Sequence, residues 1–113
     1  MSPITTHVID TSLGRPAKGM IVVLEKEESS MFIEVARGTT NHDGRIADWW
    51  KPETLMCGPY QIRFDTARYF LENECLDFFY REVKIHFEVT DSASHYHIPL
   101  LLSPFGYSTY RGS

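Results

Sequence analysis

The sequence predicts an all-β fold, a sandwich of two sheets with one short helix. Three observations support this prediction. Apolar and polar residues alternate with a period of two in most segments, turn residues separate these segments, and only one stretch begins like a helix. Short strands divided by frequent turns are typical of sandwiches. A chain of 113 residues forms one ordinary domain, which we expect to span residues 1–113.

Seven stretches are predicted as strands because they alternate or are rich in β-branched residues. They are residues 5–11, 20–27, 31–40, 58–66, 81–91, 95–102 and 106–112. Turn signals separate most of them. These signals lie at the Gly- and Pro-rich loop 12–19, the polar turn 27–30, Asp43-Gly44, Gly58-Pro59 and Ser103-Pro104.

One segment breaks the alternation and predicts the helix. DTARYFLENE begins at Asp65-Thr66, a capping-type start, and carries apolar residues at Tyr69, Phe70 and Leu71. Strict alternation returns in 81–91, with apolar residues at every second position from 83 to 89.

The composition excludes several functional classes. The formal net charge of −4 offers no basic surface for general nucleic-acid binding. No apolar run approaches the roughly 18 residues that span a membrane, and the start lacks the pattern of a signal peptide. We therefore expect a cytoplasmic protein with no nucleic-acid or membrane partner. Cys57 and Cys75 are expected to be reduced thiols.

Alternation assigns the faces of the strands that carry histidine. In HYHIPLLL, the bulky apolar set Tyr96, Ile98 and Leu100 is the natural core face. His95 and His97 then point outward with Pro99 and Leu101. In TTHVIDT, Val8 belongs to the core, so Thr5, His7 and Ile9 point outward as well. Tyr110 alternates with Arg111 in the last segment.

This outer face is unusually apolar for a surface in contact with water. It combines histidines with Ile9, Pro99, Leu101 and Tyr110. Such patches mark interfaces or ligand grooves, whereas scattered surface residues on a sheet are the plainer interpretation. The sequence favours an interface or a groove.

The residues on this face allow more than one chemistry. His95 and His97 form an H-x-H pair, which could chelate zinc with His7 as a third ligand. No Cys, Asp or Glu lies nearby in the sequence, so we expect no metal and no other cofactor. Two neutral histidines could instead share a proton and polarise a water molecule.

Arg45 follows the Asp43-Gly44 turn. From the residues alone, a solvated loop arginine is favoured over a clamp for an anion or a carbonyl. Trp49-Trp50 is predicted to serve in packing. The sequence has no serine nucleophile elbow, P-loop or Gly-rich dinucleotide motif.

Four segments together resemble the transthyretin-related proteins, the 5-hydroxyisourate hydrolases of urate breakdown. They are THVIDTSLGRPA, TTNHDGR, YQIRFDTARYF and HYHIPLLLSPFGYSTYRGS. The resemblance covers essentially the whole chain, and the Tyr-Arg-Gly-Ser ending is its most specific mark. It implies a transthyretin-like sandwich of two four-stranded sheets with one short helix. It also implies a homotetramer with active sites between dimers.

The resemblance also implies a reaction and a set of site residues. The reaction is hydrolysis of 5-hydroxyisourate to 2-oxo-4-hydroxy-4-carboxy-5-ureidoimidazoline. His7 and His97 would act as base and proton shuttle, and Arg45 would bind substrate and stabilise negative charge. The residues that would line the substrate site are Tyr110, Arg111, Gly112 and Ser113, with His95 in support.

Two other functions stay open at this point. A transthyretin-like carrier would bind a small aromatic ligand in the same cleft without turnover. A structural oligomeric sandwich would have no ligand. The hormone-carrier branch lacks this histidine pair and the Tyr-Arg-Gly-Ser ending, so the hydrolase is favoured.

Overall fold

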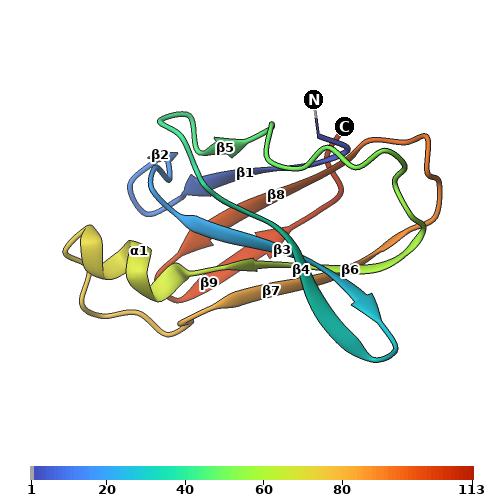
Figure 1. Cartoon of the computed structure of the whole chain (residues 1–113). Helices are drawn as coiled ribbons and strands as arrows, with labels where there is room; N and C mark the ends of the chain where they lie inside the picture. Colours follow the sequence, from blue (N-terminus) through green and yellow to red (C-terminus); the bar gives the residue numbers. More distant parts are fainter. Residues whose placement is uncertain (1) are drawn as a thin grey trace.

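Two β-sheets pack face to face, with one helix at an end of the sandwich (Figure 1). The computed structural model describes residues 2–113. Sheet A consists of β1 (Ile4–Asp10), β2 (Arg15–Pro16), β5 (Arg45–Ile46), β8 (Tyr96–Ser103) and β9 (Gly106–Thr109). Sheet B consists of β3 (Ile21–Glu28), β4 (Met31–Thr39), β6 (Gly58–Phe64) and β7 (Val83–Val89). The predicted all-β sandwich with one helix is confirmed.

The strands of sheet A follow the order β2-β1-β8-β9, and those of sheet B the order β4-β3-β6-β7. β5 also pairs with β1, which gives sheet A a fifth strand where the resemblance implied four. β2 and β5 lie within stretches predicted as a loop and a turn. Each has only two residues, which is too short to show a period in the sequence.

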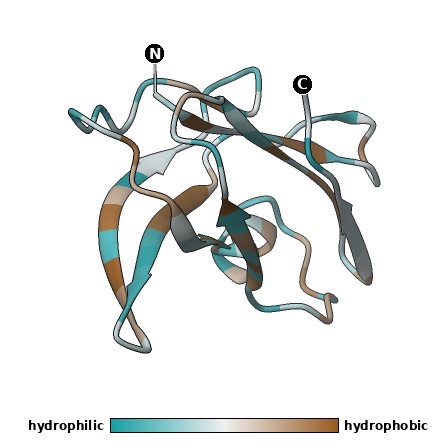
Figure 2. Ribbon diagram, turned by 90° about the vertical axis from the view of Figure 1, so that its right-hand side faces the viewer, coloured by the Kyte–Doolittle hydropathy of each residue, from teal (hydrophilic) through white to brown (hydrophobic). Residues whose placement is uncertain are grey.

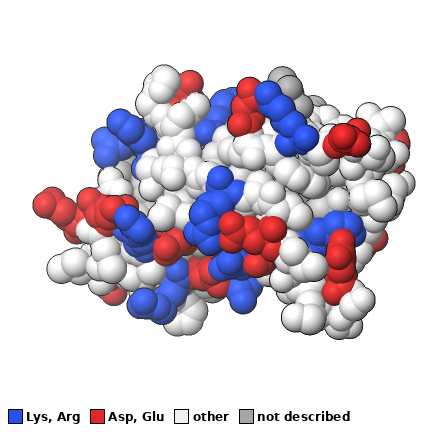
Figure 3. Space-filling model, in the orientation of Figure 1, with Lys and Arg blue, Asp and Glu red and all other residues white. Residues whose placement is uncertain are grey.

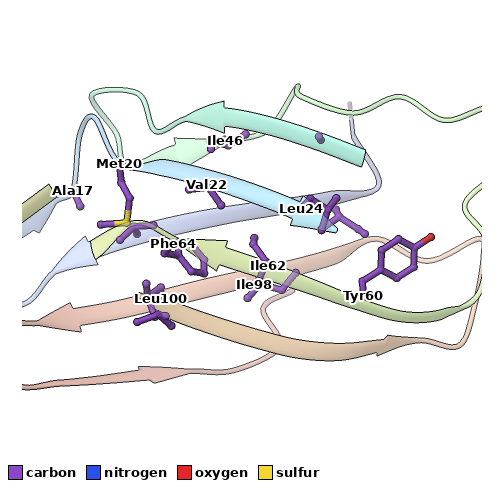
Figure 4. Close-up of a cluster of buried hydrophobic side chains, with 14 of the residues drawn as sticks. Ala17, Met20, Val22, Leu24, Ile46, Tyr60, Ile62, Phe64, Ile98 and Leu100 are labelled. Carbon is purple, nitrogen blue, oxygen red and sulfur yellow. The ribbon is translucent and has the colours of Figure 1, made fainter. Parts of the chain in front are cut away.

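Alternating side chains fill the space between the sheets, and Figure 2 shows the hydropathy changing from position to position along the strands. Figure 4 shows Leu24, Ile62 and Phe64 of sheet B in one cluster with Ile98 and Leu100 of sheet A. The predicted core face is confirmed, because the four residues assigned to it are at most 6% exposed. Each fully buried side chain of this size contributes about 1.5–3 kcal/mol.

Charged side chains of both signs are interspersed on the surface shown in Figure 3. On sheet B, Arg63 of β6 forms ion pairs with Glu25 at 3.0 Å and with Glu82 at 2.8 Å. A mixed surface of this kind creates no extended field of one sign.

The two adjacent tryptophans pack against the core, as predicted. The indole N–H of Trp49 donates a hydrogen bond to the carbonyl oxygen of Ile4 at 2.8 Å. The backbone N–H groups of Trp49 and Trp50 both donate to the Ser2 hydroxyl at 2.9 Å. These bonds hold the segment after β5 against the start of β1.

Helix α1 (Thr66–Glu72) begins where the sequence predicts it. The Asp65 carboxylate accepts a hydrogen bond from the backbone N–H of Arg68 at 3.2 Å, which confirms the cap. Tyr69 and Phe70 are buried, whereas Leu71 is 52% exposed. No helix in residues 2–113 is long and apolar enough to cross a membrane.

A buried hydrogen bond ties α1 to the end of β1. The Tyr69 hydroxyl donates to Oδ2 of Asp10 at 2.7 Å. Burial alone would raise the pKa of the Asp10 carboxyl, but hydrogen bonds from Ser12, Tyr69 and Leu13 bring this pKa below its ordinary value. Burial and the Asp10 contact raise the pKa of Tyr69. The carboxylate is therefore kept ionised as an acceptor.

A proline interrupts the pairing of β8 with the C-terminal segment. β8 is a central strand, where a proline removes a ladder hydrogen bond. β9 ends at Thr109, and pairing resumes in the same register at the bridge between His97 and Gly112. Pro99 therefore lies opposite Tyr110, and its carbonyl accepts a hydrogen bond from the Thr109 hydroxyl at 2.7 Å. The last residues return to the sheet beside His97.

We expect Tyr69→Phe to destabilise the protein. The substitution leaves the buried Asp10 carboxylate without one donor, and a hydrogen bond to a charged group contributes about 1.5–3 kcal/mol. Urea unfolding followed by far-UV circular dichroism should show a loss of this size. The control is Tyr107→Phe on an exposed ring, which should change the free energy of unfolding by less than about 0.5 kcal/mol. Equal stability of the two variants would contradict the role of the Tyr69 hydroxyl.

Candidate active site

The strand register brings the three predicted catalytic residues to one face of sheet A. On β1, His7 lies opposite Arg45 of β5. On the other side of β1, Thr5 lies opposite His97 of β8. Thr5 and His7 are two residues apart on one strand, so their side chains point the same way. Both histidines and the arginine therefore lie on the outer face, which is the face of sheet A that points away from the core.

The turn before β5 determines where Arg45 lies. The side-chain oxygen of Asn41 accepts a hydrogen bond from the Arg45 backbone N–H at 3.0 Å. Gly44 has a φ of +74°, and a Cβ there would overlap the carbonyl oxygen of Val8. The Gly44 carbonyl accepts a hydrogen bond from the Val8 N–H at 2.7 Å. The turn is thus held against β1, and only glycine fits at its closest approach.

A hollow of about 190 Å³ lies over this part of the outer face. Its lining includes Thr5, Arg45, His95, His97 and Ser113. Pockets for drug-sized ligands have about 300–1,000 Å³, so this hollow suits a smaller molecule. It combines a guanidinium, two imidazoles and two hydroxyl groups.

A threonine hydroxyl joins the two histidines of the HYH motif. Thr5 Oγ1 lies 3.0 Å from Nε2 of His95 and 2.8 Å from Nδ1 of His97. Thr5 is only 4% exposed, although it points to the outer face. Alternation along the sequence predicts the face on which Thr5 lies, but not its contact with the two histidines. The missing signal was the parallel register of β1 with β8, which alternation within each strand does not reveal.

Burial and positive charge lower the pKa of both His7 and His97. Burial is the largest cause for each residue, and the charge of Arg45 is the second. His95 and His7 lower the pKa of His97 further, whereas Asp43 opposes the shift at His7. Both imidazoles are therefore biased towards the neutral form, which a general base requires.

The C-terminal segment packs on the imidazole of His97. The backbone N–H of Gly112 donates a hydrogen bond to the His97 carbonyl at 2.8 Å. A Cβ on Gly112 would lie 2.6 Å from His97 Cδ2 and 3.2 Å from Pro99 Cγ. Glycine therefore permits this contact, and Ser113 follows at the edge of the hollow.

Two other residues of the terminal motif lie elsewhere. The guanidinium carbon of Arg111 lies 4.3 Å from the centroid of the Tyr96 ring, and its Nη2 donates to the His95 carbonyl at 3.3 Å. Tyr110 is 60% exposed. Arg111 and Tyr110 line a second hollow, of about 270 Å³, rather than the hollow that holds Arg45.

The histidine pair is not arranged as part of a metal centre. Within residues 2–113, no group of three or more His, Cys, Asp or Glu side chains could hold a metal ion. Nε2 of His95 and Nδ1 of His97 both face the Thr5 hydroxyl. His7, the third ligand considered for zinc, pairs across the sheet with Arg45, whose positive charge disfavours a cation.

The model of the HIUase/Transthyretin family matches residues 4–112. This chain belongs to that family. The 5-hydroxyisourate hydrolase of Salmonella dublin is 41% identical to it over 110 residues, which cover 97% of this chain and 80% of the relative. The 5-hydroxyisourate hydrolase of Mus musculus is 41% identical over 114 residues, which cover 99% and 96% of the two chains. The family predicted from the sequence is confirmed.

Solved structures of a 5-hydroxyisourate hydrolase and of a transthyretin both share the fold of this chain. The 5-hydroxyisourate hydrolase of Klebsiella pneumoniae superposes with a TM-score of 0.82 at 34% identity, covering 97% of this chain and 98% of that chain. Sea bream transthyretin in complex with thyroxine superposes with a TM-score of 0.92 at 25% identity, covering 98% and 95%. Because the backbone fits the transthyretin at least as well, only the side chains of the site can separate the two functions.

We expect Gly112→Ala to displace the tail or the His97 ring. The new methyl group would contact His97 Cδ2 and Pro99 Cγ too closely, and such overpacking costs about 1–3 kcal/mol. The imidazole NMR signals of His97 should shift, and the amide at 112 should lose protection against hydrogen exchange. Gly106→Ala is the control, since its methyl group would meet Ser103 Oγ at an ordinary 3.8 Å. Unchanged His97 signals in Gly112→Ala would contradict the packing role.

Proposed function

We propose that this chain hydrolyses 5-hydroxyisourate to 2-oxo-4-hydroxy-4-carboxy-5-ureidoimidazoline, a step of urate degradation and so of purine metabolism. The observation that carries the proposal is the meeting of His7, Arg45 and His97 on one face of sheet A. Relatives at 41% identity carry the name of this hydrolase, which supports the same chemistry here.

The residues present supply what the reaction needs. A water molecule attacks a ring carbonyl, a C–O bond forms, the ring C–N bond breaks, and the leaving nitrogen takes up a proton. His7 and His97 accept the proton of water and return it to the nitrogen. Arg45 binds the flat polar ring and stabilises the negative charge on the carbonyl oxygen. Gly112 and Ser113 close one side of the site.

His97 offers one nitrogen to the substrate. Its Nδ1 faces Thr5, and within residues 2–113 no hydrogen bond occupies its Nε2. Nε2 is therefore the atom of His97 through which a proton enters or leaves. His7 does not line the hollow, but it lies opposite Arg45 across the sheet and its charge lowers the pKa of His97, which supports a role beside the same ligand.

We further propose a homotetramer with active sites between dimers. The hollow is open in one chain, and apolar side chains at Ile9, Pro99 and Leu101 share the outer face with it. β9 is an edge strand, whose free backbone groups can pair with a second copy. A second dimer on this face would exclude bulk water and strengthen the contact of Arg45 with the developing charge. The cytoplasmic location expected from the sequence stays a prediction.

A carrier of a small aromatic ligand is the second candidate, because the transthyretin structure superposes so closely. A carrier needs the hollow but neither neutral histidines nor turnover. Freshly generated 5-hydroxyisourate separates the two functions, since a hydrolase speeds the decay of its ultraviolet absorbance. A rate equal to that in buffer would refute the proposed hydrolysis.

His97→Asn should lower kcat by roughly 10²–10⁴-fold, because a positioned general base contributes that much. The absorbance assay measures the rate, and sedimentation velocity should show an unchanged oligomer. His42→Asn is the matched control, since the His42 side chain is 78% exposed and lies in a turn. Full activity of His97→Asn would remove His97 from the mechanism.

The activity should fall at acid pH with an inflection below 6.5. Burial and Arg45 hold the pKa of His7 and His97 below that ordinary value, so the neutral base persists to lower pH. Arg45→Gln removes a positive neighbour, which raises both pKa values and moves the inflection to higher pH, besides slowing the reaction. The measurement is the pH dependence of kcat/KM, with Arg37→Gln on sheet B as the control. An inflection unmoved by Arg45→Gln would contradict the electrostatic role.

A further inference from the structure

The Thr5 hydroxyl has no role in the reaction steps proposed above, although it contacts both histidines of the HYH motif. Its oxygen lies within hydrogen-bond distance of an imidazole nitrogen on each of two histidines, at 3.0 Å and 2.8 Å. Thr5 is 4% exposed and paired with His97 in the middle of sheet A. His95, in contrast, is exposed to solvent. The hydroxyl thus connects a solvent-facing imidazole with a partly buried one.

A hydroxyl carries one proton, so it donates one hydrogen bond and accepts the other. Of the two nitrogens that face Thr5, one must carry a hydrogen and the other a lone pair. When both rings are neutral, they must therefore hold the same tautomer. Either His95 and His97 both carry the hydrogen on Nδ1, or both carry it on Nε2.

The alternative, in which Thr5 accepts from both rings, leaves the hydroxyl proton without a partner. Within residues 2–113, the two imidazole nitrogens are the polar atoms in hydrogen-bond contact with Thr5 Oγ1. An unsatisfied buried donor costs about 1–3 kcal/mol, so this arrangement is disfavoured.

We infer that Thr5 is a positioning residue that couples the protonation of His95 to the tautomer of His97. The inference rests on the proposed hydrolysis for its effect on rate. When neutral His95 carries its hydrogen on Nδ1, the hydroxyl donates to its Nε2 and accepts from Nδ1–H of His97. The lone pair of His97 is then on Nε2, ready to take a proton from water.

Protonation of His95 reverses the direction of both hydrogen bonds at the Thr5 hydroxyl. Its Nε2 becomes a donor, the hydroxyl turns towards Nδ1 of His97, and the hydrogen of neutral His97 moves to Nε2. In that state His97 cannot accept a proton at the atom that faces substrate. The exposed histidine therefore determines when the partly buried one can act as a base.

Other charged and titratable groups around the pair act from different directions. Arg45 and His7 face His97 from β5 and β1. Arg111 contacts His95 through the backbone carbonyl and not through the imidazole. These groups change how readily the rings take up protons, but the pairing of tautomers runs through Thr5 alone among the described residues.

The first test compares Thr5→Val, which keeps the branched shape but loses the hydroxyl, with Thr5→Ser, which keeps the hydroxyl. Partners that orient a metal-bound histidine through its second nitrogen contribute roughly 10–100-fold in affinity or activity, and we expect kcat of Thr5→Val to fall by a comparable factor. KM should stay within about a factor of three, because Thr5 orients the base and Arg45 binds the substrate. Thr5→Ser should retain most of the rate. Equal kcat in wild type and Thr5→Val would overturn the inference.

The second test needs no substrate. Long-range ¹H–¹⁵N spectra of the imidazoles report which nitrogen carries hydrogen. In the wild type, the two neutral rings should show the same tautomer, and His97 should carry its hydrogen on Nε2 whenever His95 is protonated. In Thr5→Val, the tautomer of His97 should not follow His95, whereas in Thr5→Ser it should.

These experiments distinguish a failure of the proposed hydrolysis from a failure of the proposed role of Thr5. Different tautomers on the neutral rings of the wild type would overturn the inference without any variant, even if Thr5→Val failed to fold. Wild-type hydrolysis together with unlinked tautomers would leave the proposed function intact and remove the role of Thr5. Linked tautomers without hydrolysis would remove the proposed function and retain the bridge.

Discussion

The parallel pairing of β1 with β8 is the constraint on which the site depends. Its register places Thr5 beside His97 and His7 beside Pro99, so that residues about ninety positions apart share one row across the sheet. A shift by one residue would turn every side chain of one strand to the other face. The core and the site would then be lost together, because Val8 and His7 alternate on the same strand. Packing of the apolar face thus also aligns the polar one.

Two glycines outside the β1–β8 pair, Gly44 and Gly112, complete this arrangement. The turn at Gly44 is held to β1 by a backbone hydrogen bond, which brings a guanidinium against the strand without a long element to support it. At the other edge, Gly112 lets the chain approach the His97 ring closely. Both positions require glycine for steric reasons. The positions of Arg45 and of the chain beside the His97 ring therefore depend on backbone sites that leave little conformational freedom.

Alternation was enough to predict the strands and the sidedness of His7, His95 and His97, since burial of one face imposes a period of two. The helix was predicted where this alternation stops, at the capping-type start Asp65-Thr66. It could not reveal β2 and β5, which are too short to show a period and exist because β1 offers an open edge. The importance of Thr5 was equally hidden, because it follows from a pairing between distant strands. Arg45 is exposed, as the sequence indicated, but its pairing opposite His7 could not be seen before the turn was placed on β1. Arg111 was expected at the substrate site with the rest of the terminal motif, whereas it stacks on the ring of Tyr96, a contact that depends on where the interrupted ladder resumes.

The break at Pro99 divides the pairing of β8 with the C-terminal segment into two parts. Behind it, the β8–β9 hairpin keeps its own ladder as far as Thr109. Beyond it, the segment is attached by the Gly112 hydrogen bond and by the stacking of Arg111 on Tyr96. The final residues are therefore paired to β8 through a single bridge, whereas the hairpin before them has four paired positions. The missing N–H of Pro99 thus lies two residues from His97, between the β8–β9 ladder and the bridge to Gly112.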